Sequence, residues 1–154
     1  MKLAEALQER ADLNRKISEL RRRITNSILV QEGEDPAEEP KELITELDEA
    51  VSRLEILMAA INLTNCRTKA GGMTLTDIIA RKDALTLKLS EYRDAAETAG
   101  QSTYRARGSE IRVKALVKAA ELQKKADAMA KEIRELDNLL QETNWKTKLI
   151  ETAR

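Results

Sequence analysis

Apolar residues recur at alternating steps of three and four along most of the chain, which is the spacing of one face of a helix. The clearest pattern lies in residues 41–68. One stripe there comprises Ile44, Leu47, Val51, Leu54, Met58, Ile61 and Asn65, and a second beside it comprises Leu43, Ala50, Leu57 and Thr64. Two adjacent stripes are typical of a helix that is contacted from two sides, as in a bundle.

The same spacing predicts four long helices, over about residues 2–30, 41–68, 75–99 and 116–151. The segment between the first two contains Gly33, Pro36, Pro40 and several acidic residues. We interpret it as an exposed turn whose acids favour the start of the next helix, with an acidic docking site as the alternative. Gly71-Gly72 and Gly100 are natural helix ends, and Thr74 with Asp77 resembles a capping box.

Residues 101–117 have a different pattern. From Glu110 onward, charged and apolar residues alternate, which is a period of two. We predict a short extended segment that pairs with its own copy in another subunit; an irregular loop and the beginning of the fourth helix are the alternatives. The fourth helix would then span roughly 50 Å, longer than a compact four-helix domain, so one end is expected to project and to favour a homo-oligomer.

The composition also favours long helices, because 35% of the residues are charged, only 2% are aromatic and Gly and Pro are few. We therefore predict an all-α fold: one domain over residues 1–154, an antiparallel four-helix bundle with long coiled-coil-like helices and one short extended segment. The 27 basic residues balance the 27 acidic ones, which gives no reason to expect nucleic acid as a partner. A single cysteine and the lack of an apolar signal segment favour the cytoplasm.

The side chains offer no catalytic or metal-binding constellation. The chain has no histidine, and its glycines do not have the spacing of a phosphate-binding loop. Carboxylates are abundant, but they fall on helix faces that are expected to be solvated. We therefore expect no enzymatic activity, no cofactor and no metal.

A short sequence motif occurs twice. Thr64-Asn65-Cys66-Arg67-Thr68-Lys69 and Thr143-Asn144-Trp145-Lys146-Thr147-Lys148 both read Thr-Asn-x-basic-Thr-Lys, although chance similarity remains an alternative. In an up-down-up-down bundle the second and fourth helices are parallel, so both motifs would lie toward the same end. The candidate polar cluster is Asn62, Thr64, Asn65, Thr143 and Asn144. We favour a role in fixing helix register over a small-molecule site.

A second candidate site is an interface or an anion contact. Its residues are Arg105, Arg107, Arg112, Lys114 and Trp145. Trp145 falls beside the apolar seam of its helix, where it would either cover the bundle end or anchor an interface. Arg21-Arg22-Arg23 fans around its helix and is interpreted as a solvent-exposed face, with a partner contact as the alternative.

The chain resembles a family of small bacterial proteins without an assigned activity, some of which carry the label septicolysin. The resemblance rests on Met1-Lys2-Leu3-Ala4-Glu5-Ala6-Leu7, Val30-Gln31-Glu32-Gly33-Glu34-Asp35-Pro36, Ile61-Asn62-Leu63-Thr64-Asn65, Leu75-Thr76-Asp77 with Arg81-Lys82-Asp83, Glu110-Ile111, and Gln141-Glu142-Thr143-Asn144-Trp145. These stretches cover nearly the whole chain in order. The resemblance implies an all-helical fold.

Three functions are compatible with these observations. The first is a self-associating helical bundle with a structural or interaction role. The second, which the septicolysin label implies, is a membrane-active, pore-forming toxin, and it alone would make a membrane the partner. The third is a bundle that binds a small ligand through Asn62, Asn65 and Asn144. We favour the first, because mutual packing of the helices explains their apolar faces.

Overall fold

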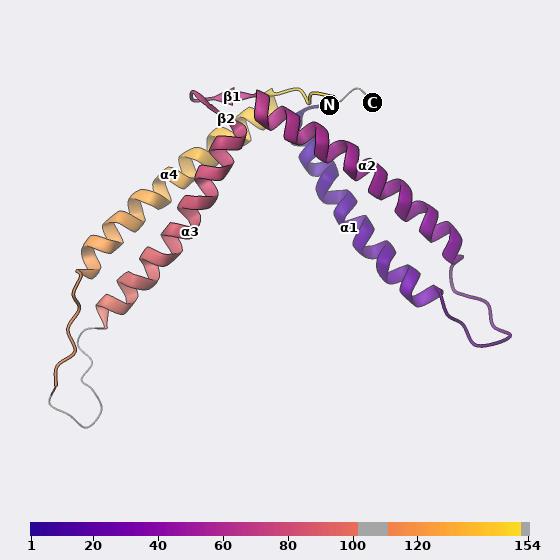
Figure 1. Ribbon diagram of the computed structural model, residues 1–154, viewed down its shortest axis with the longest axis horizontal. Helices are drawn as coiled ribbons and strands as arrows, with labels where there is room; N and C mark the ends of the chain where they lie inside the picture. Colours follow the sequence, from indigo (N-terminus) through magenta and orange to yellow (C-terminus); the bar gives the residue numbers. More distant parts are fainter. Residues whose placement is uncertain (102–110, 152–154) are drawn as a thin grey trace. The chain divides into compact units, whose positions relative to one another are not determined.

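The computed structural model describes residues 1–101 and 111–151, and these residues form an essentially all-α protein (Figure 1). Four helices follow one another: α1 (Leu3–Ser27), α2 (Pro40–Arg67), α3 (Leu75–Gly100) and α4 (Ala119–Lys146). Between α2 and α3 lie two short strands, β1 (Lys69–Ala70) and β2 (Met73–Thr74). The all-α class with four long helices is confirmed.

The chain divides into two compact units. The first unit comprises Met1–Thr68 with Glu142–Arg154 and contains α1 and α2. The second comprises Lys69–Gln141 and contains β1, β2, α3 and most of α4. Each unit is built on one antiparallel pair of helices (Figure 1). The expectation of a single domain over residues 1–154 stays a prediction.

The apolar faces of α1 and α2 form the core of the first unit. The buried side chains on α1 are Leu3, Ala6, Leu20 and Ser27, and those on α2 are Leu43, Ala50, Leu57, Ala60, Ile61 and Thr64. Two ion pairs join facing positions of α1 and α2 and mark the antiparallel register. Arg53 Nε donates to Glu9 Oε1 at 2.6 Å, and Lys16 Nζ lies 2.8 Å from Glu46 Oε1.

The fourth helix is shorter than predicted, because it ends at Lys146 and not near residue 151. The residues that follow pair with the start of the chain: Leu3 N donates to Thr147 O at 2.9 Å and Leu149 N donates to Met1 O at 3.1 Å. An antiparallel bridge joins Lys2 and Lys148. The N–H of Leu3 has no acceptor within its own helix. Extended pairing satisfies this donor, whereas a longer α4 would leave it without a protein acceptor.

The hydroxyl of Thr64 holds the same segment from the side of α2. Thr64 is fully buried, its Oγ1 accepts a hydrogen bond from Ile150 N at 2.9 Å, and it donates to Ala60 O at 2.8 Å. Buried backbone donors need such acceptors. A single threonine therefore links the end of α2 to the C-terminal segment.

The second unit begins with a β-hairpin that the sequence pattern did not predict. Lys69 pairs with Thr74, and the turn between them places Gly71 and Gly72 at φ +56° and +85°, a conformation that favours glycine. Thr74 then caps α3 as predicted: Asp77 N donates to Thr74 Oγ1 at 3.1 Å, and Thr74 N donates to Asp77 Oδ2 at 3.2 Å. The hydroxyl of Thr74 donates to Asp77 Oδ2 at 2.6 Å, and this hydrogen bond, together with the one from Thr74 N, lowers the pKa of the Asp77 carboxyl below its ordinary value.

The segment predicted to be extended is only partly described. Residues 111–118 belong to no helix and to no named strand, and α4 begins at Ala119, three residues later than expected. Pairing of this segment with another copy of the chain stays a prediction. The first helix ends at Ser27 and not near residue 30, and Ile28, Leu29 and Val30 beyond it are exposed.

The two helix pairs begin alike. Met1-Lys2-Leu3 leads into α1 as Met73-Thr74-Leu75 leads into α3, and both leucines are fully buried. The backbone N–H of the residue before each helix donates to an acidic side chain three residues on: Lys2 N to Glu5 Oε2 at 2.6 Å, and Thr74 N to Asp77 Oδ2. The same local chemistry starts both helices.

The two pairs also end alike. Lys69 and Lys148 are the last residues of the two Thr-Asn-x-basic-Thr-Lys motifs. Lys69 pairs with Thr74, directly before α3, and Lys148 pairs with Lys2, directly before α1. Corresponding positions of the motif therefore have corresponding partners. We infer that the chain contains two structurally equivalent helical hairpins, and that the motif marks the end of each.

An ion pair between the helices recurs with its charges exchanged. When Leu3 is aligned with Leu75 and Thr64 with Thr143, Glu9 corresponds to Arg81 and Arg53 corresponds to Glu132. Arg81 Nε donates to Glu132 Oε1 at 2.6 Å, as Arg53 does to Glu9. The geometry of the pair is thus common to both hairpins, while the direction of the charges is not.

Replacing Thr64 by valine should destabilise the protein by about 1–3 kcal/mol, because Ile150 N would lose its acceptor in a partly buried place beside the fully buried residue 64. Urea denaturation measures the change, and amide hydrogen exchange should show faster exchange at Ile150. Thr45→Val is the matched control, since Thr45 bonds only Lys41 O and is exposed. An equal loss in both variants would contradict the role of Thr64.

Glu9→Arg should destabilise the first unit by about 0.5–1 kcal/mol at neutral pH, and the double variant Glu9→Arg/Arg53→Glu should recover most of that loss. The hydrogen bond from Arg53 lowers the pKa of the Glu9 carboxyl. The pair therefore stabilises the native protein above the unfolded pKa of Glu9, and this contribution is lost as the pH falls through the lowered value. Urea denaturation at neutral and acidic pH tests both statements.

The exposed pair of Arg15 with Asp12, which lies within one helix, provides the control for that cycle. Exchanging its two charges should change the stability little at either step. A double variant at Glu9 and Arg53 no more stable than the single one would show that their position does not accept exchanged charges.

Candidate functional site

The residues of the predicted polar cluster differ in how deeply they are buried. Thr64 and Asn144 are buried, Asn65 and Thr143 are half-buried, and Asn62 is exposed. Thr64 contacts the C-terminal segment through Ile150. Within residues 1–101 and 111–151, none of the three asparagine side chains is in a hydrogen bond. A role of these residues in helix register or ligand binding stays a prediction.

The predicted basic site is described in part. Arg105 and Arg107 lie outside the described residues, whereas Arg112 and Lys114 are exposed. Trp145 is 62% exposed near the end of α4. An indole this accessible is available to a partner.

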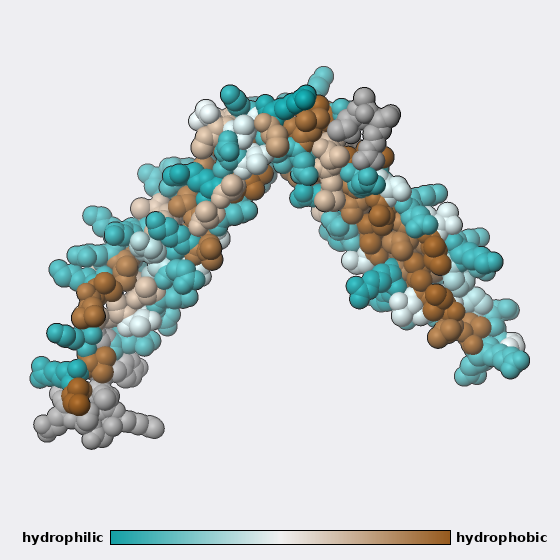
Figure 2. All heavy atoms as spheres, viewed as in Figure 1, coloured by the Kyte–Doolittle hydropathy of each residue, from teal (hydrophilic) through white to brown (hydrophobic). Residues whose placement is uncertain are grey.

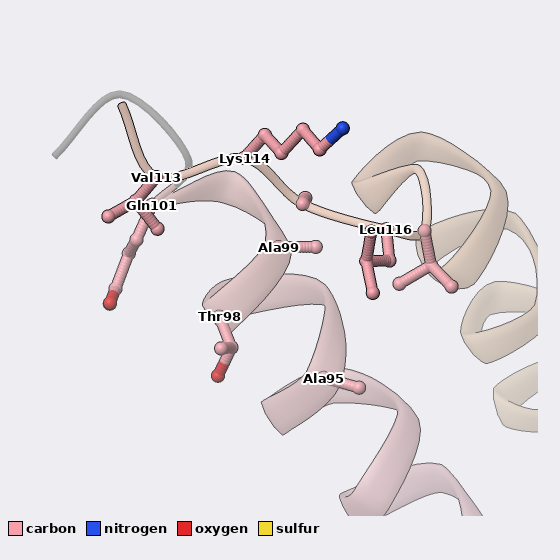
Figure 3. Close-up of a pocket in the computed structure, with 9 residues that line it drawn as sticks. Ala95, Thr98, Ala99, Gln101, Val113, Lys114 and Leu116 are labelled. Carbon is pink, nitrogen blue, oxygen red and sulfur yellow. The ribbon is translucent and has the colours of Figure 1, made fainter. Parts of the chain in front are cut away.

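Lys114 borders a groove in the second unit (Figure 3). The groove has a volume of about 510 Å³. Ala95 and Ala99 of α3 project toward the segment that carries Leu116, which is itself 90% exposed (Figure 3). The lining is mostly apolar with one amine at its edge, so it could accept an apolar group that carries an anion. Apart from Ala99, its lining residues are exposed, so the groove gives an occupant little enclosure.

A more extended apolar surface lies on α2. Ile44, Val51 and Met58 are 40%, 47% and 46% exposed, although they belong to the most regular stripe of the sequence. We call these three residues the α2 strip. The neighbouring stripe of Leu43, Ala50, Leu57 and Thr64 is buried. Figure 2 shows apolar side chains gathered in a band along the pair of α1 and α2.

The hairpin architecture does not require the α2 strip. In the equivalent second hairpin the corresponding positions hold Gln123, Ala130 and Asp137. Those residues stand on α4 beside a core that is formed without them, because Ala126, Leu136 and Leu140 are the buried residues there. A series of exposed apolar residues that the fold does not need typically marks an interaction surface.

Two charged groups border the α2 strip. Asp48 follows Ile44 by four residues and precedes Val51 by three, so it lies next to the strip on α2. Arg10 is half-buried on α1. The equivalent residue on α3 is Lys82, whose Nζ lies 2.7 Å from Oδ1 of Asp137, and Asp137 is equivalent to Met58. This equivalence would place Arg10 on the side of α1 nearest Met58.

Among the described residues, neither of these charged side chains forms an ion pair. The second hairpin pairs its equivalent cation with an acid, whereas the first presents an apolar Met58 at that position. The surface around the α2 strip therefore combines apolar side chains with a cation and an anion that are both available.

Sequence reasoning placed the α2 strip in a core because its spacing is that of a packed helix face. Periodicity shows that a face is apolar but does not show what covers it. The sequence did contain evidence that the strip is exposed. When the two Thr-Asn motifs are aligned, Ile44 and Met58 correspond to the polar residues Gln123 and Asp137. Arg10 and Asp48 were not singled out, because their relation appears only once the hairpins are compared.

Among residues 1–101 and 111–151, no helix is both long and apolar enough to cross a membrane. Within the same residues, no group of three or more His, Cys, Asp or Glu side chains is arranged to hold a metal ion.

Comparison with known proteins identifies relatives but no activity. Residues 10–149 match the model of a family of unknown function, DUF6847. The crystal structure of a functionally unknown conserved protein from Corynebacterium diphtheriae is 43% identical, with a TM-score of 0.89 over 97% of this chain and 99% of that one. No curated protein matches. The expected relation to proteins of unassigned activity is confirmed, whereas the septicolysin label finds no support in these matches.

The exposure of Trp145 can be checked in solution, because it is the single tryptophan of the chain. We expect its fluorescence to resemble that of free tryptophan and to be quenched by iodide almost as strongly in the native as in the unfolded protein. A blue-shifted native emission that moves to the red on unfolding would instead place the indole in a buried contact.

Proposed function

We propose that this chain, which belongs to the DUF6847 family of unknown function, is a non-enzymatic helical protein that self-associates and serves a structural or interaction role. The observation that carries the proposal is the α2 strip, whose three side chains remain 40–47% exposed. A cytoplasmic location, which the single cysteine favours, is part of the same proposal.

Keeping these apolar side chains in contact with water costs free energy. Full burial of a valine, isoleucine or methionine side chain is worth about 1.5–3 kcal/mol, and each residue of the strip is between two fifths and a half exposed. Covering all three side chains on both partners therefore offers several kcal/mol of binding free energy. Each 1.4 kcal/mol corresponds to a tenfold change in affinity. A helical partner with the same spacing can provide that cover.

No observation of similar weight supports a membrane-active toxin or a small-ligand-binding bundle. Contact between helices explains the buried apolar residues of α1 and α2, and self-association already accounts for the exposed α2 strip. A ligand site built from asparagines would require their amides to converge, and Asn62 is exposed while Asn144 is buried.

Purified protein should have at least twice the 17.3 kDa mass of one chain in multi-angle light scattering. Val51→Asp should shift it to the monomer, because a carboxylate cannot be buried in the contact without a large desolvation cost. Ile56→Asp is the matched control, since Ile56 is 41% exposed on the same helix but off the strip, and it should leave the mass unchanged.

A wild-type mass of one chain at all accessible concentrations would overturn the proposal. Equal effects of the two substitutions would show that the association does not use the α2 strip. Circular dichroism of each variant establishes that its helices are intact.

A further inference from the structure

We propose that the α2 strip is covered by the α2 strip of a second copy of this chain, antiparallel about a two-fold axis near Val51, with Arg10 of each copy paired to Asp48 of the other. The inference rests on the proposed function and specifies its partner, surface and register. It is carried by the geometry of the first unit and by its comparison with the second.

The position of Arg10 along α2 follows from the ion pairs of the first unit. Glu9 pairs with Arg53 and Lys16 pairs with Glu46, so Arg10 stands level with the middle of α2. Its equivalent Lys82 reaches its acid at the position that corresponds to Met58. The guanidinium of Arg10 therefore belongs at the strip between Val51 and Met58.

The antiparallel arrangement provides the missing acid at that place. Around a two-fold axis near Val51, Ile44 of one copy lies opposite Met58 of the other, so the strips cover each other along their whole length. Asp48 precedes Val51 by about one helical turn, so the Asp48 of the other copy falls about one turn beyond Val51, beside Arg10. By symmetry this contact occurs twice.

Charge complementarity favours a second copy over an unrelated helix. The surface contains both members of the ion pair, one on α1 and one on α2, and neither has an ion-pair partner among the described residues of its own chain. In the second hairpin the same position forms its pair internally, between Lys82 and Asp137. A self-complementary surface is what a two-fold contact requires.

Charge reversal tests the ion pair. Arg10→Asp and Asp48→Arg should each raise the dimer dissociation constant about tenfold or more, because each places like charges together at two sites. The double variant Arg10→Asp/Asp48→Arg should restore it to within a few fold of wild type. Glu49→Arg is the matched control: it neighbours Asp48 but lies off the strip, and it should leave the dissociation constant unchanged.

Cross-linking tests the face and the direction of the helices without disturbing the fold. In a Cys66→Ser background, Val51→Cys should be joined to its copy by a short bis-maleimide, whereas Ile56→Cys should not. Ile44→Cys alone should not cross-link, because its copy would lie roughly 20 Å away along the axis. A mixture of Ile44→Cys and Met58→Cys chains should cross-link to each other.

The outcomes separate this inference from the proposed function. A wild-type monomer overturns both. A wild-type dimer that is insensitive to the reversals and does not cross-link at Val51→Cys overturns the inference and leaves self-association in place. Cross-linking of Ile44→Cys to itself would show a parallel pair, and single reversals without rescue in the double variant would exclude the pairing of Arg10 with Asp48.

Discussion

The first unit depends on the backbone pairing between the residues that follow α4 and the residues that begin α1. The residues after α4 hydrogen-bond to Met1 and Leu3, and Thr64 accepts a further N–H from Ile150. These bonds satisfy donors that a helix start and an extended tail would otherwise leave open. They also fix where α1 begins, and with it the register in which Leu3 and Ala6 reach the core.

The equivalence of the two hairpins separates what the fold needs from what it does not. The capping acids, the buried leucines at the helix starts and the pairing of the motif lysines occur in both. The ion pair between the helices occurs in both with its charges exchanged, so its position matters more than its sign. By the same comparison, the α2 strip is a property of the first hairpin alone, and its explanation lies outside hairpin packing.

Periodicity predicted the helices well because apolar spacing and capping chemistry act locally. On α3, Ile78, Leu89 and Ala96 recur at helical spacing and are buried, while Leu85 and Tyr92 of the same stripe are half-buried. The end of α4 was missed because Thr147 and Ile150 continue its spacing, while the backbone donors of distant residues decide their conformation. Gly71 and Gly72 were predicted only to end a helix, whereas they form the turn of the β-hairpin. The candidate surface was misjudged because a stripe of apolar residues does not show whether its cover is internal.

The first hairpin has an apolar strip and the second does not, and this difference bears on which assemblies the proposed contact would allow. A chain with one apolar strip can bury it in a closed two-fold dimer, after which no equivalent surface remains. If α4 carried the same strip in place of Gln123, Ala130 and Asp137, each chain would offer two such faces and contacts could continue from copy to copy. Asp137 works against this, because its charge, paired with Lys82, would be expensive to bury in an apolar contact. The polar residues of α4 would thus restrict the proposed association to the surface on α2.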